Sequence, residues 1–357
     1  MPRARRRPRR ARDGDDVKRA ASWLVRRSAT AAVALIGATV LSLAIAVGLP
    51  GDPARVLVGP QARPADVEVA QRIYGLDGTW YQRLGRHLGR VVHRAPAAGA
   101  SPDARAHASC SAPIAAVHVD LGTSFAYRKP VAALVWARLP RSLELALGAL
   151  VVQLIIGLGA GVLAGARRGG RADDVVMGAA LLGASAPTFV VGAALQHVLA
   201  YRLHLLPLDG VGKGLGQHLA SLVLPSIVLG VYGSALLARL TRDQVRAALA
   251  ADPARTARAK GAGPLRVVVA HGLRNALLPI ATLAVLDLGA LVGGAIVTEK
   301  IFRWPGLGDM AVTAIVNRDA AATTGVALAA ATVVAVASIA VDLLALLLDP
   351  RLRGGAQ

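Results

Sequence analysis

Six long apolar segments constrain the fold of this 357-residue chain more than any other feature of its sequence. A helix rises about 1.5 Å per residue, so about 20 mainly apolar residues are needed to cross a hydrocarbon core of about 30 Å. The segments lack the alternation of β-strands and are too long for ordinary ones, which argues against a β-barrel. We therefore predict an all-α polytopic membrane protein with six transmembrane helices. Their windows are Ala29–Leu49, Leu143–Ala166, Val175–Ala200, Leu219–Leu240, Ala276–Val297 and Thr323–Leu348.

The composition agrees with a membrane protein rather than with a soluble nucleic-acid-binding one. Only 17% of the residues are charged, against about 25% in an average soluble domain. The formal net charge of +20 would favour a nucleic-acid partner if the chain were soluble. However, the basic residues flank the apolar segments, and aromatic residues do not interleave with them as a stacking platform requires. We expect the lipid bilayer, and no nucleic acid, as a partner.

Basic residues near the ends of the apolar segments indicate how the helices are oriented. If the segments alternate across the membrane, four basic stretches fall on one side: Arg26–Arg27, Arg167–Arg171, the loop 242–275 and Arg351–Arg353. Lys and Arg accumulate in short cytoplasmic loops, so we predict that both termini are cytoplasmic. The first window also resembles a cleaved signal peptide, but its apolar run of about 21 residues exceeds the 7–15 or so typical of one.

This orientation divides the chain into five parts. Residues 50–141 carry many Arg residues, but long segments cross a membrane largely regardless of charge. An Ala/Pro-rich stretch near 95–119 reads as a flexible outer insertion. The predicted parts are a basic cytoplasmic tail 1–28, a first transmembrane helix 29–49, an extracytoplasmic segment 50–141, a five-helix core 142–348 with a cytoplasmic loop 242–275, and a cytoplasmic tail 349–357.

Few polar residues lie within the apolar segments, and those few are candidates for lining a pore. An ionisable group at mid-bilayer costs about 2.5–3.5 kcal/mol or more. Asp287 lies inside the fifth window, where it either lines a cavity or pairs with another helix. Gln153 and Gln196 are further candidates. The spacing of Gly157, Gly161 and Gly165 predicts close approach of a neighbouring helix.

Signatures of catalysis and of metal binding are absent from the sequence. It has no G-x-x-x-x-G-K-[ST] phosphate loop and no H-E-x-x-H zinc helix. The eight histidines are scattered without metal-ligand spacing on one helical face. We therefore predict that the chain is not an enzyme, that it has no metal site and that it binds no cofactor of its own.

The loop 242–275 predicts a short helix at residues Ala254–Lys260. Asp252 is a candidate N-cap, Pro253 suits the first turn and Gly261 suits a left-handed stop. Ala254, Ala257 and Gly261 form a smooth stripe, and Arg255 and Arg258 form a cationic edge. A helix of two turns is marginal in water without a partner surface. The alternative is an ordinary basic loop, but the order of cap, proline, stripe and glycine favours docking.

Two stretches of this loop resemble the "EAA" loop of bacterial ABC-importer permeases, and more narrowly that of the dipeptide/oligopeptide/nickel permease family. They are Arg255–Gly261 and His271–Pro279. Further matches in the family's order are Pro50–Pro53, Tyr74–Asp77, Asp120–Ser124, Arg138–Pro140, Leu143–Leu145, Phe302–Gly308, Asp342 and Leu348–Arg351. The chain departs from the family at Pro253, where an aromatic residue is usual, and at Asp287, where Gln is common. Arg255 stands where the loop's name has glutamate, as is usual in this branch.

The resemblance implies a type I ABC importer permease fold in the bacterial cytoplasmic membrane. Such a permease would form half of a pore for peptides, nickel chelates or similar small solutes. Its implied partners are a second permease, which favours a heterodimer, two ATP-binding-cassette ATPases and an extracytoplasmic solute-binding protein. ATP and Mg would be bound by the ATPases. The implied ATPase-coupling residues are Arg255, Thr256, Ala257, Arg258, Lys260 and Gly261.

A secondary carrier or channel working without partners is the alternative function. It would be driven by an ion gradient and would need intramembrane ionisable groups, often arranged in inverted repeats. The single central Asp287 and the lack of a repeat signal disfavour this alternative.

Overall fold

The computed structural model describes most of the chain from residue 26 to residue 348. The described residues are 26–42, 44–45, 53–59, 61–73, 78–79, 81–82, 85, 89, 92–94, 117–167 and 170–348. The predicted tails 1–28 and 349–357 therefore lie wholly or almost wholly outside the described residues, as does Cys110. The cytoplasmic location of the termini stays a prediction.

Within the described part of the chain, four helices are long and apolar enough to cross a membrane. They are α5 (Val131–Ala166), α8 (Leu215–Ala250), α11 (Arg274–Gly294) and α14 (Ala320–Leu348). Each contains or overlaps one predicted window, but α5 begins twelve residues before its window and α8 continues ten residues beyond its own. Residues 26–42 and 44–45, within and just before the first window, are also helical.

The third predicted window is not one straight helix but two helical segments with a sharp bend between them. Helix α6 (Arg171–Ser185) is followed by α7 (Thr188–Leu195) and a π-helix, η1 (Gln196–Arg202), and the two halves are bent by 92°. The break lies at Ala186 and Pro187, which are both extended. Proline has no amide hydrogen and disfavours a helical residue before it, which explains the break. Counting the bent pair as one span gives up to five candidate spans among the described residues, which include only part of the first predicted window.

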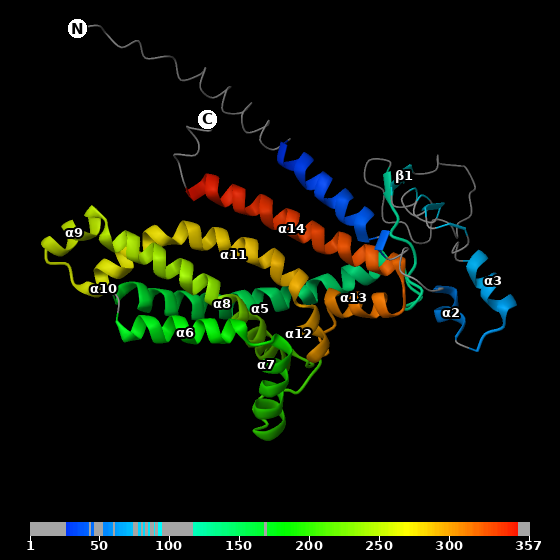
Figure 1. The fold of residues 1–357 in the computed structure, drawn as a ribbon, viewed down its shortest axis with the longest axis horizontal. Coiled ribbons are helices and arrows are strands. Elements are labelled where there is room, and N and C mark those ends of the chain that lie inside the picture. The colour runs from blue at the N-terminus through cyan, green and yellow to red at the C-terminus, as the bar shows by residue number, and fades with distance from the viewer. Residues whose placement is uncertain are drawn as a thin grey trace, which may run out of the picture.

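The long helices form one elongated bundle, in which α5 and α8 run parallel and α11 runs antiparallel to both (Figure 1). Gly157 of α5 lies against Leu237 of α8, and Gly165, one end of the same stripe, lies against Val245. A Cβ on Gly161 would come within 2.6 Å of the Ala238 carbonyl oxygen. The predicted close approach at this glycine stripe is confirmed, and its partner is α8.

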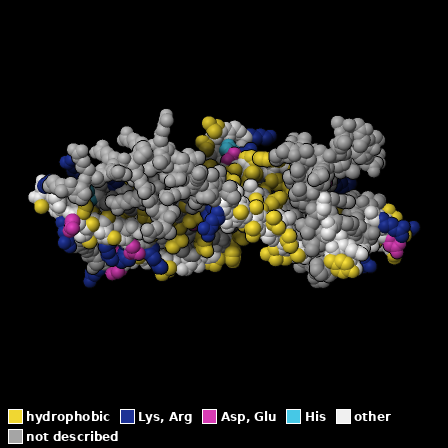
Figure 2. Space-filling view, turned by 90° about the horizontal axis from the view of Figure 1, so that it is seen from above, with side chains coloured by type: hydrophobic (Ala, Val, Ile, Leu, Met, Phe, Trp, Pro, Cys, Tyr) yellow, Lys and Arg dark blue, Asp and Glu magenta, His cyan; other side chains and the backbone are white. Residues whose placement is uncertain are grey.

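These directions bring the basic loops together at one end of the bundle. The end of α5, the start of α6, the end of α8 and the start of α11 all lie there, together with α9 (Asp252–Ala259), α10 (Pro264–Val267) and the π-helix η2 (Val268–Leu273). In Figure 2, basic and acidic side chains lie at this left-hand end and also at the right-hand end, and most of the coloured side chains between the two ends are hydrophobic. The geometry agrees with alternating spans.

The opposite end of the bundle is built from short elements. Helices α12 (Ile296–Ile301) and α13 (Leu307–Val316) fold back against the start of α5. The start of α14 packs on the same surface through Ala321, Ala322 and Val326. This end contains the Phe302–Gly308 motif.

The region before α5 contains a pair of short strands as well as helices. Helices α2 (Pro53–Val58) and α3 (Pro64–Ile73) pack together through Ala54, Val67 and Ala70. Strand β1 (Val92–Arg94) pairs antiparallel with β2 (Val117–Val119). The predicted insertion near 95–119 thus ends in β2, and the rest of it lies outside the described residues.

Candidate functional site

The loop helix predicted from the sequence is present as α9, with a different N-terminal cap. The helix begins at Asp252, and its N-cap residue is Ala251, whose side chain cannot accept a hydrogen bond. The predicted capping role of Asp252 is therefore wrong: Asp252 lies in the first turn, 4.0 Å from Arg255. An acidic residue there still favours the helix, because it interacts with the helix dipole. Gly261 has a φ of +80°, as expected of a left-handed stop.

The small-residue stripe of α9 faces the protein's own core. Ala254 is fully buried and packs in a cluster with Val245 and Leu249 of α8, and Ala257 is partly buried in the same cluster. Ala254 and Ala257 therefore hold α9 on its own bundle, whereas Gly261, the third residue of the predicted stripe, is exposed. The outward face is different: Arg255, Thr256, Arg258, Lys260 and Gly261 are all exposed. These five residues form what we call the outward face of α9.

A buried carboxylate ties α6 to α8 next to this loop. Arg242 Nε lies 2.7 Å from Asp173 Oδ1, and Arg246 Nη2 lies 2.7 Å from Asp173 Oδ2. The Asp173 side chain is almost fully buried. Removing one partner of such a buried pair leaves an uncompensated charge, so the three residues fix α6 against α8. Asp173 was not predicted from the sequence, although two adjacent acidic residues, Asp173 and Asp174, directly after a basic stretch were a usable signal.

Two of the three predicted pore-lining residues meet in the middle of the bundle. The Gln153 amide on α5 donates a hydrogen bond of 2.6 Å from Nε2 to Asp287 Oδ2 on α11. Gln153 is fully buried, and its Oε1 has no hydrogen-bond partner among the described residues. Gln196 lies elsewhere, where its Nε2 donates to the carbonyl oxygens of Leu208 and Ile301 at 2.7 and 3.4 Å. The structure thus brings Gln153 and Asp287 together and leaves Gln196 apart.

Gln153 and Asp287 line a cavity of about 840 Å³. The break between α6 and α7 forms one of its walls through Ser185–Phe189, and Tyr232 of α8 forms another. Non-helical backbone at membrane depth is tolerated where it lines a cavity or is buried in protein. A volume of this size is typical of small-molecule sites, which run from about 300 to about 1,000 Å³.

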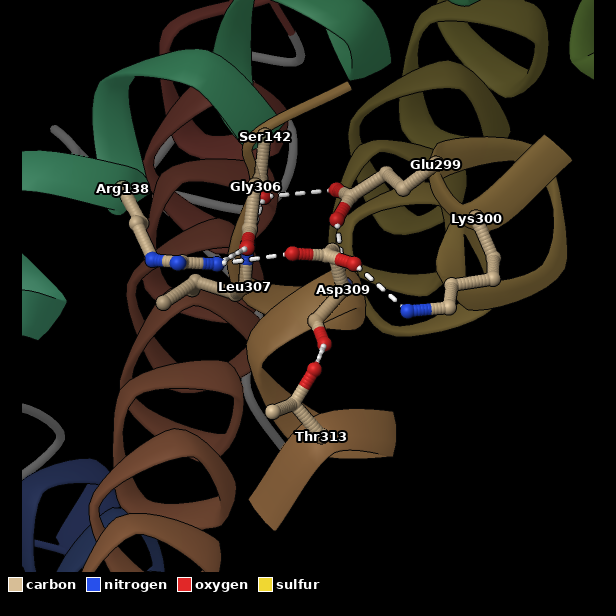
Figure 3. Close-up of polar contacts among 8 residues, drawn as sticks. All are labelled: Arg138, Ser142, Glu299, Lys300, Gly306, Leu307, Asp309 and Thr313. Carbon is tan, nitrogen blue, oxygen red and sulfur yellow. Dashed lines mark hydrogen bonds and ion pairs between the residues drawn. The ribbon is translucent and has the colours of Figure 1, made fainter. Parts of the chain in front are cut away.

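A second buried carboxylate, Glu299, organises the opposite end of the bundle (Figure 3). Ser142 Oγ donates to Glu299 Oε1 at 2.7 Å, and the Asp309 amide donates to Oε2 at 3.0 Å. Ser142 Oγ also accepts a hydrogen bond from the Leu307 amide at 2.7 Å. Glu299 therefore links α5, α12 and α13 through buried hydrogen bonds.

Ion pairs surround this buried group at the protein surface. Arg138 of α5 donates to Asp309 Oδ2 at 3.0 Å, and Lys300 donates to Oδ1 at 3.0 Å (Figure 3). Trp304 is fully buried, and its Nε1 donates to the Arg141 carbonyl oxygen at 2.8 Å. These contacts explain the Phe302–Gly308 motif as a structural element that docks on the start of α5.

Burial raises the pKa of the Glu299 carboxyl above its ordinary value, although the Ser142 hydroxyl and backbone amides partly oppose that shift. Desolvation disfavours the charged form, which is the larger effect here. Glu299 was not predicted from the sequence, although it precedes a recognised motif by only three positions. Asp319 was also missed: it accepts hydrogen bonds from Ser124 Oγ and from the Ala322 amide, at 2.6 and 3.0 Å.

Two family matches cover nearly the whole chain. Residues 157–354 match the family described as the inner membrane component of binding-protein-dependent transport systems. Residues 20–146 match the N-terminal family of the same membrane components. The chain is an inner-membrane permease of this family. It is therefore a transport component of the bacterial cytoplasmic membrane with several membrane-crossing helices, as predicted.

Named relatives place the permease among peptide-type systems. It is 32% identical to the oligopeptide transport system permease protein AppB of Bacillus subtilis over 338 residues, covering 93% of this chain and 99% of that protein. It is 36% identical to the glutathione transport system permease protein GsiC of Escherichia coli over 271 residues, covering 76% of this chain and 79% of that protein.

A solved structure shares the fold of the permease. A chain of the MetNI methionine ABC transporter in an inward-facing form aligns with a TM-score of 0.51 at 19% identity, covering 62% of this chain and 98% of that chain. The predicted permease fold is thus confirmed at the level of its helical core. The number of six helices stays a prediction.

Proposed function

We propose that this permease forms half of the translocation pore of an ABC importer for peptides or similar small solutes. The observation that carries the proposal is the match to an oligopeptide permease over 93% of this chain. A cavity of about 840 Å³, mainly apolar but with polar groups such as Gln153, Tyr232 and Asp287 in its lining, supports it, because a peptide in transit needs polar contacts within the apolar bundle. A second, similar permease would supply the other half of the pore, and an extracytoplasmic binding protein would deliver the solute.

We further propose that one of the two cytoplasmic ATPases grips the outward face of α9. Its exposed cationic and small residues suit a groove that carries carboxylates. The inward contacts of Ala254 and Ala257 anchor α9 to α8 and to the start of α11, so a force applied to α9 would reach the bundle. The buried Asp173 pairs would carry the same movement to α6.

The decisive experiment is purification of the tagged permease in mild detergent from its native membrane. A second permease and an ATPase pair should co-purify with it, and their stoichiometry would test the heterodimer. Reconstituted complexes should then accumulate radiolabelled trialanine only when ATP and Mg are supplied. Uptake by the purified chain without ATPases, driven by an ion gradient, would instead support the secondary carrier.

Coupling through α9 is tested by a variant that changes only the exposed face. Thr256→Trp should leave the permease inserted and paired with its permease partner, while ATPase binding falls by about tenfold or more. Ala247→Trp, on an exposed position of α8 close by, is the matched control and should retain ATPase binding. Normal ATPase binding by Thr256→Trp would rule out α9 as the docking element.

A further inference from the structure

The cavity between α5, α8, α11 and the break between α6 and α7 is lined by the carboxylate of Asp287, which has no basic partner among the described residues. Asp287 is partly exposed to this cavity, and its hydrogen-bond partner among the described residues is the neutral amide of Gln153. Among the described residues, no Arg, Lys or His side chain forms an ion pair with Asp287. A charged group in an apolar span is expected to face an aqueous path or to find a partner.

The side-chain amide of Gln153 makes one hydrogen bond, through Nε2, and leaves its oxygen without one. Its Oε1 is buried and lacks a hydrogen-bond partner in the described part of the chain. The amide lies against Gly233 of α8, where a Cβ would stand 2.6 Å from Oε1. Because Oε1 is enclosed by α8, it is out of reach of a solute, and the Gln153 amide presents its donating Nε2 to Asp287. The Asp287 carboxylate is the part of this pair that borders the cavity, and a donor group of a solute would bind there.

The lining of the cavity favours a cation over an anion. Asp287 is the charged residue among its lining residues, and Tyr232 and Phe189 add aromatic faces, which attract cations. An anion would meet the Asp287 carboxylate without a compensating basic side chain on the cavity wall. The cavity volume of about 840 Å³ accommodates a small peptide with one such group.

We propose that this cavity is a transit site for a cationic group, an ammonium or a guanidinium, and that Asp287 selects for it, with Gln153 positioning the carboxylate. The proposal rests on the proposed function of solute import. It assigns charge selection to the pore itself, in addition to any selection by a binding protein.

The first test measures charge selection at the cavity without any transport. Tyr232→Cys is introduced into a chain in which the native Cys110 is replaced by serine, and the complete importer is labelled with cationic and anionic methanethiosulfonate reagents of similar size. The cationic reagent should react faster, and Asp287→Asn should reduce the ratio of the two rates by about tenfold. Asp287→Glu should preserve the ratio.

Two results of the labelling test would overturn the inference. An unchanged rate ratio in Asp287→Asn would show that the carboxylate does not set the charge preference. Absence of reaction with either reagent would show that the cavity is closed to solutes. Glu144→Gln is the matched control, because Glu144 pairs with Arg141 and His218 away from the cavity, and it should leave the ratio unchanged.

The second test uses uptake by the reconstituted importer of trialanine, N-acetyl-trialanine and an N-acetylated tripeptide with a central lysine. If the α-ammonium is the selected group, Asp287→Asn should slow trialanine uptake by about tenfold and leave residual N-acetyl-trialanine uptake unchanged. If a side-chain ammonium is selected, uptake of the lysine peptide should fall instead.

Failure of the wild-type importer to take up any of the three peptides would refute the proposed function. Equal uptake rates in wild type and Asp287→Asn would refute only the charge-selection inference.

Discussion

The two carboxylates Glu299 and Asp287 lie in opposite kinds of surroundings. Glu299 is fully buried, and groups of the protein itself donate to both of its oxygens. Asp287 has one amide partner, and the rest of its carboxylate borders a cavity. A carboxylate whose hydrogen bonds are completed by the fold serves stability. One that the fold leaves incomplete is available to a ligand, and the following predictions test this distinction.

The largest effect is expected from Glu299→Ala. The change leaves the Ser142 hydroxyl and the Asp309 amide without their acceptor and opens a cavity, so we expect a loss of about 3 kcal/mol in unfolding free energy. Thermal unfolding of the purified protein, followed by circular dichroism, measures it. Glu144→Ala, at a half-exposed ion pair of the same end, should cost less than about 1 kcal/mol. Equal losses in the two variants would contradict the structural role of Glu299.

A smaller loss is expected from Ser142→Ala, because this hydroxyl joins Glu299 to the Leu307 amide. Its removal leaves a buried amide unsatisfied, which costs about 1–2 kcal/mol. Thr332→Ala removes an exposed hydroxyl that bonds only within its own helix and should change stability by about 0.5 kcal/mol or less. The same unfolding measurement compares the two, and indistinguishable melting temperatures would count against the Glu299 network.

The pH dependence of stability should carry the signature of Glu299. Because its pKa is raised in the folded state, the folded protein binds the proton more tightly than the unfolded chain. This contribution is fully present below the ordinary pKa of about 4.5 and is lost as the pH rises through the raised value. Plots of melting temperature against pH for wild type and Glu299→Gln should run parallel below about 4.5 and diverge between the ordinary and the raised pKa, where the wild type loses stability. Parallel curves throughout would show that Glu299 is not shifted.

The smallest effect on stability is expected from Asp287→Asn. The Asn oxygen can still accept the Gln153 hydrogen bond, and no buried ion pair of Asp287 is lost, so the change should be about 0.5 kcal/mol or less. A loss of about 2 kcal/mol would show that Asp287 is structural and would erase the contrast with Glu299. Thermal unfolding of Asp287→Asn is compared with that of wild type and of Glu299→Gln in the same detergent.

Local sequence patterns predicted those elements of this permease that depend on the residues of one helix alone. The apolar windows predicted α5, α8, α11 and α14, because the length and apolar composition of a segment are enough to identify a helix that can cross a membrane. The left-handed Gly261 followed from its place after a short helix. The family itself was recognisable because its motifs lie in a fixed order along the chain.

Contacts between distant segments could not be predicted in the same way. Local sequence could not show whether Asp287 pairs with another helix or lines a cavity. Its partner Gln153 is 134 residues away in sequence, and only the fold brings the two side chains together. The inward turn of the Ala254 stripe depended on the position of α8. The bend at Pro187 was invisible to a window average, because apolar composition does not encode direction.

The sequence by itself determined that this chain crosses a membrane, where its helices lie and which family it belongs to, because these follow from the free energy of burying apolar side chains and from local backbone preferences. The tertiary structure decided which polar groups complete each other's hydrogen bonds. Glu299 is enclosed by α5, α12 and α13, which supply its hydrogen-bond donors, whereas Asp287 borders a cavity. The difference arises because a buried carboxylate needs hydrogen-bond partners, and packing determines whether the protein or a ligand provides them.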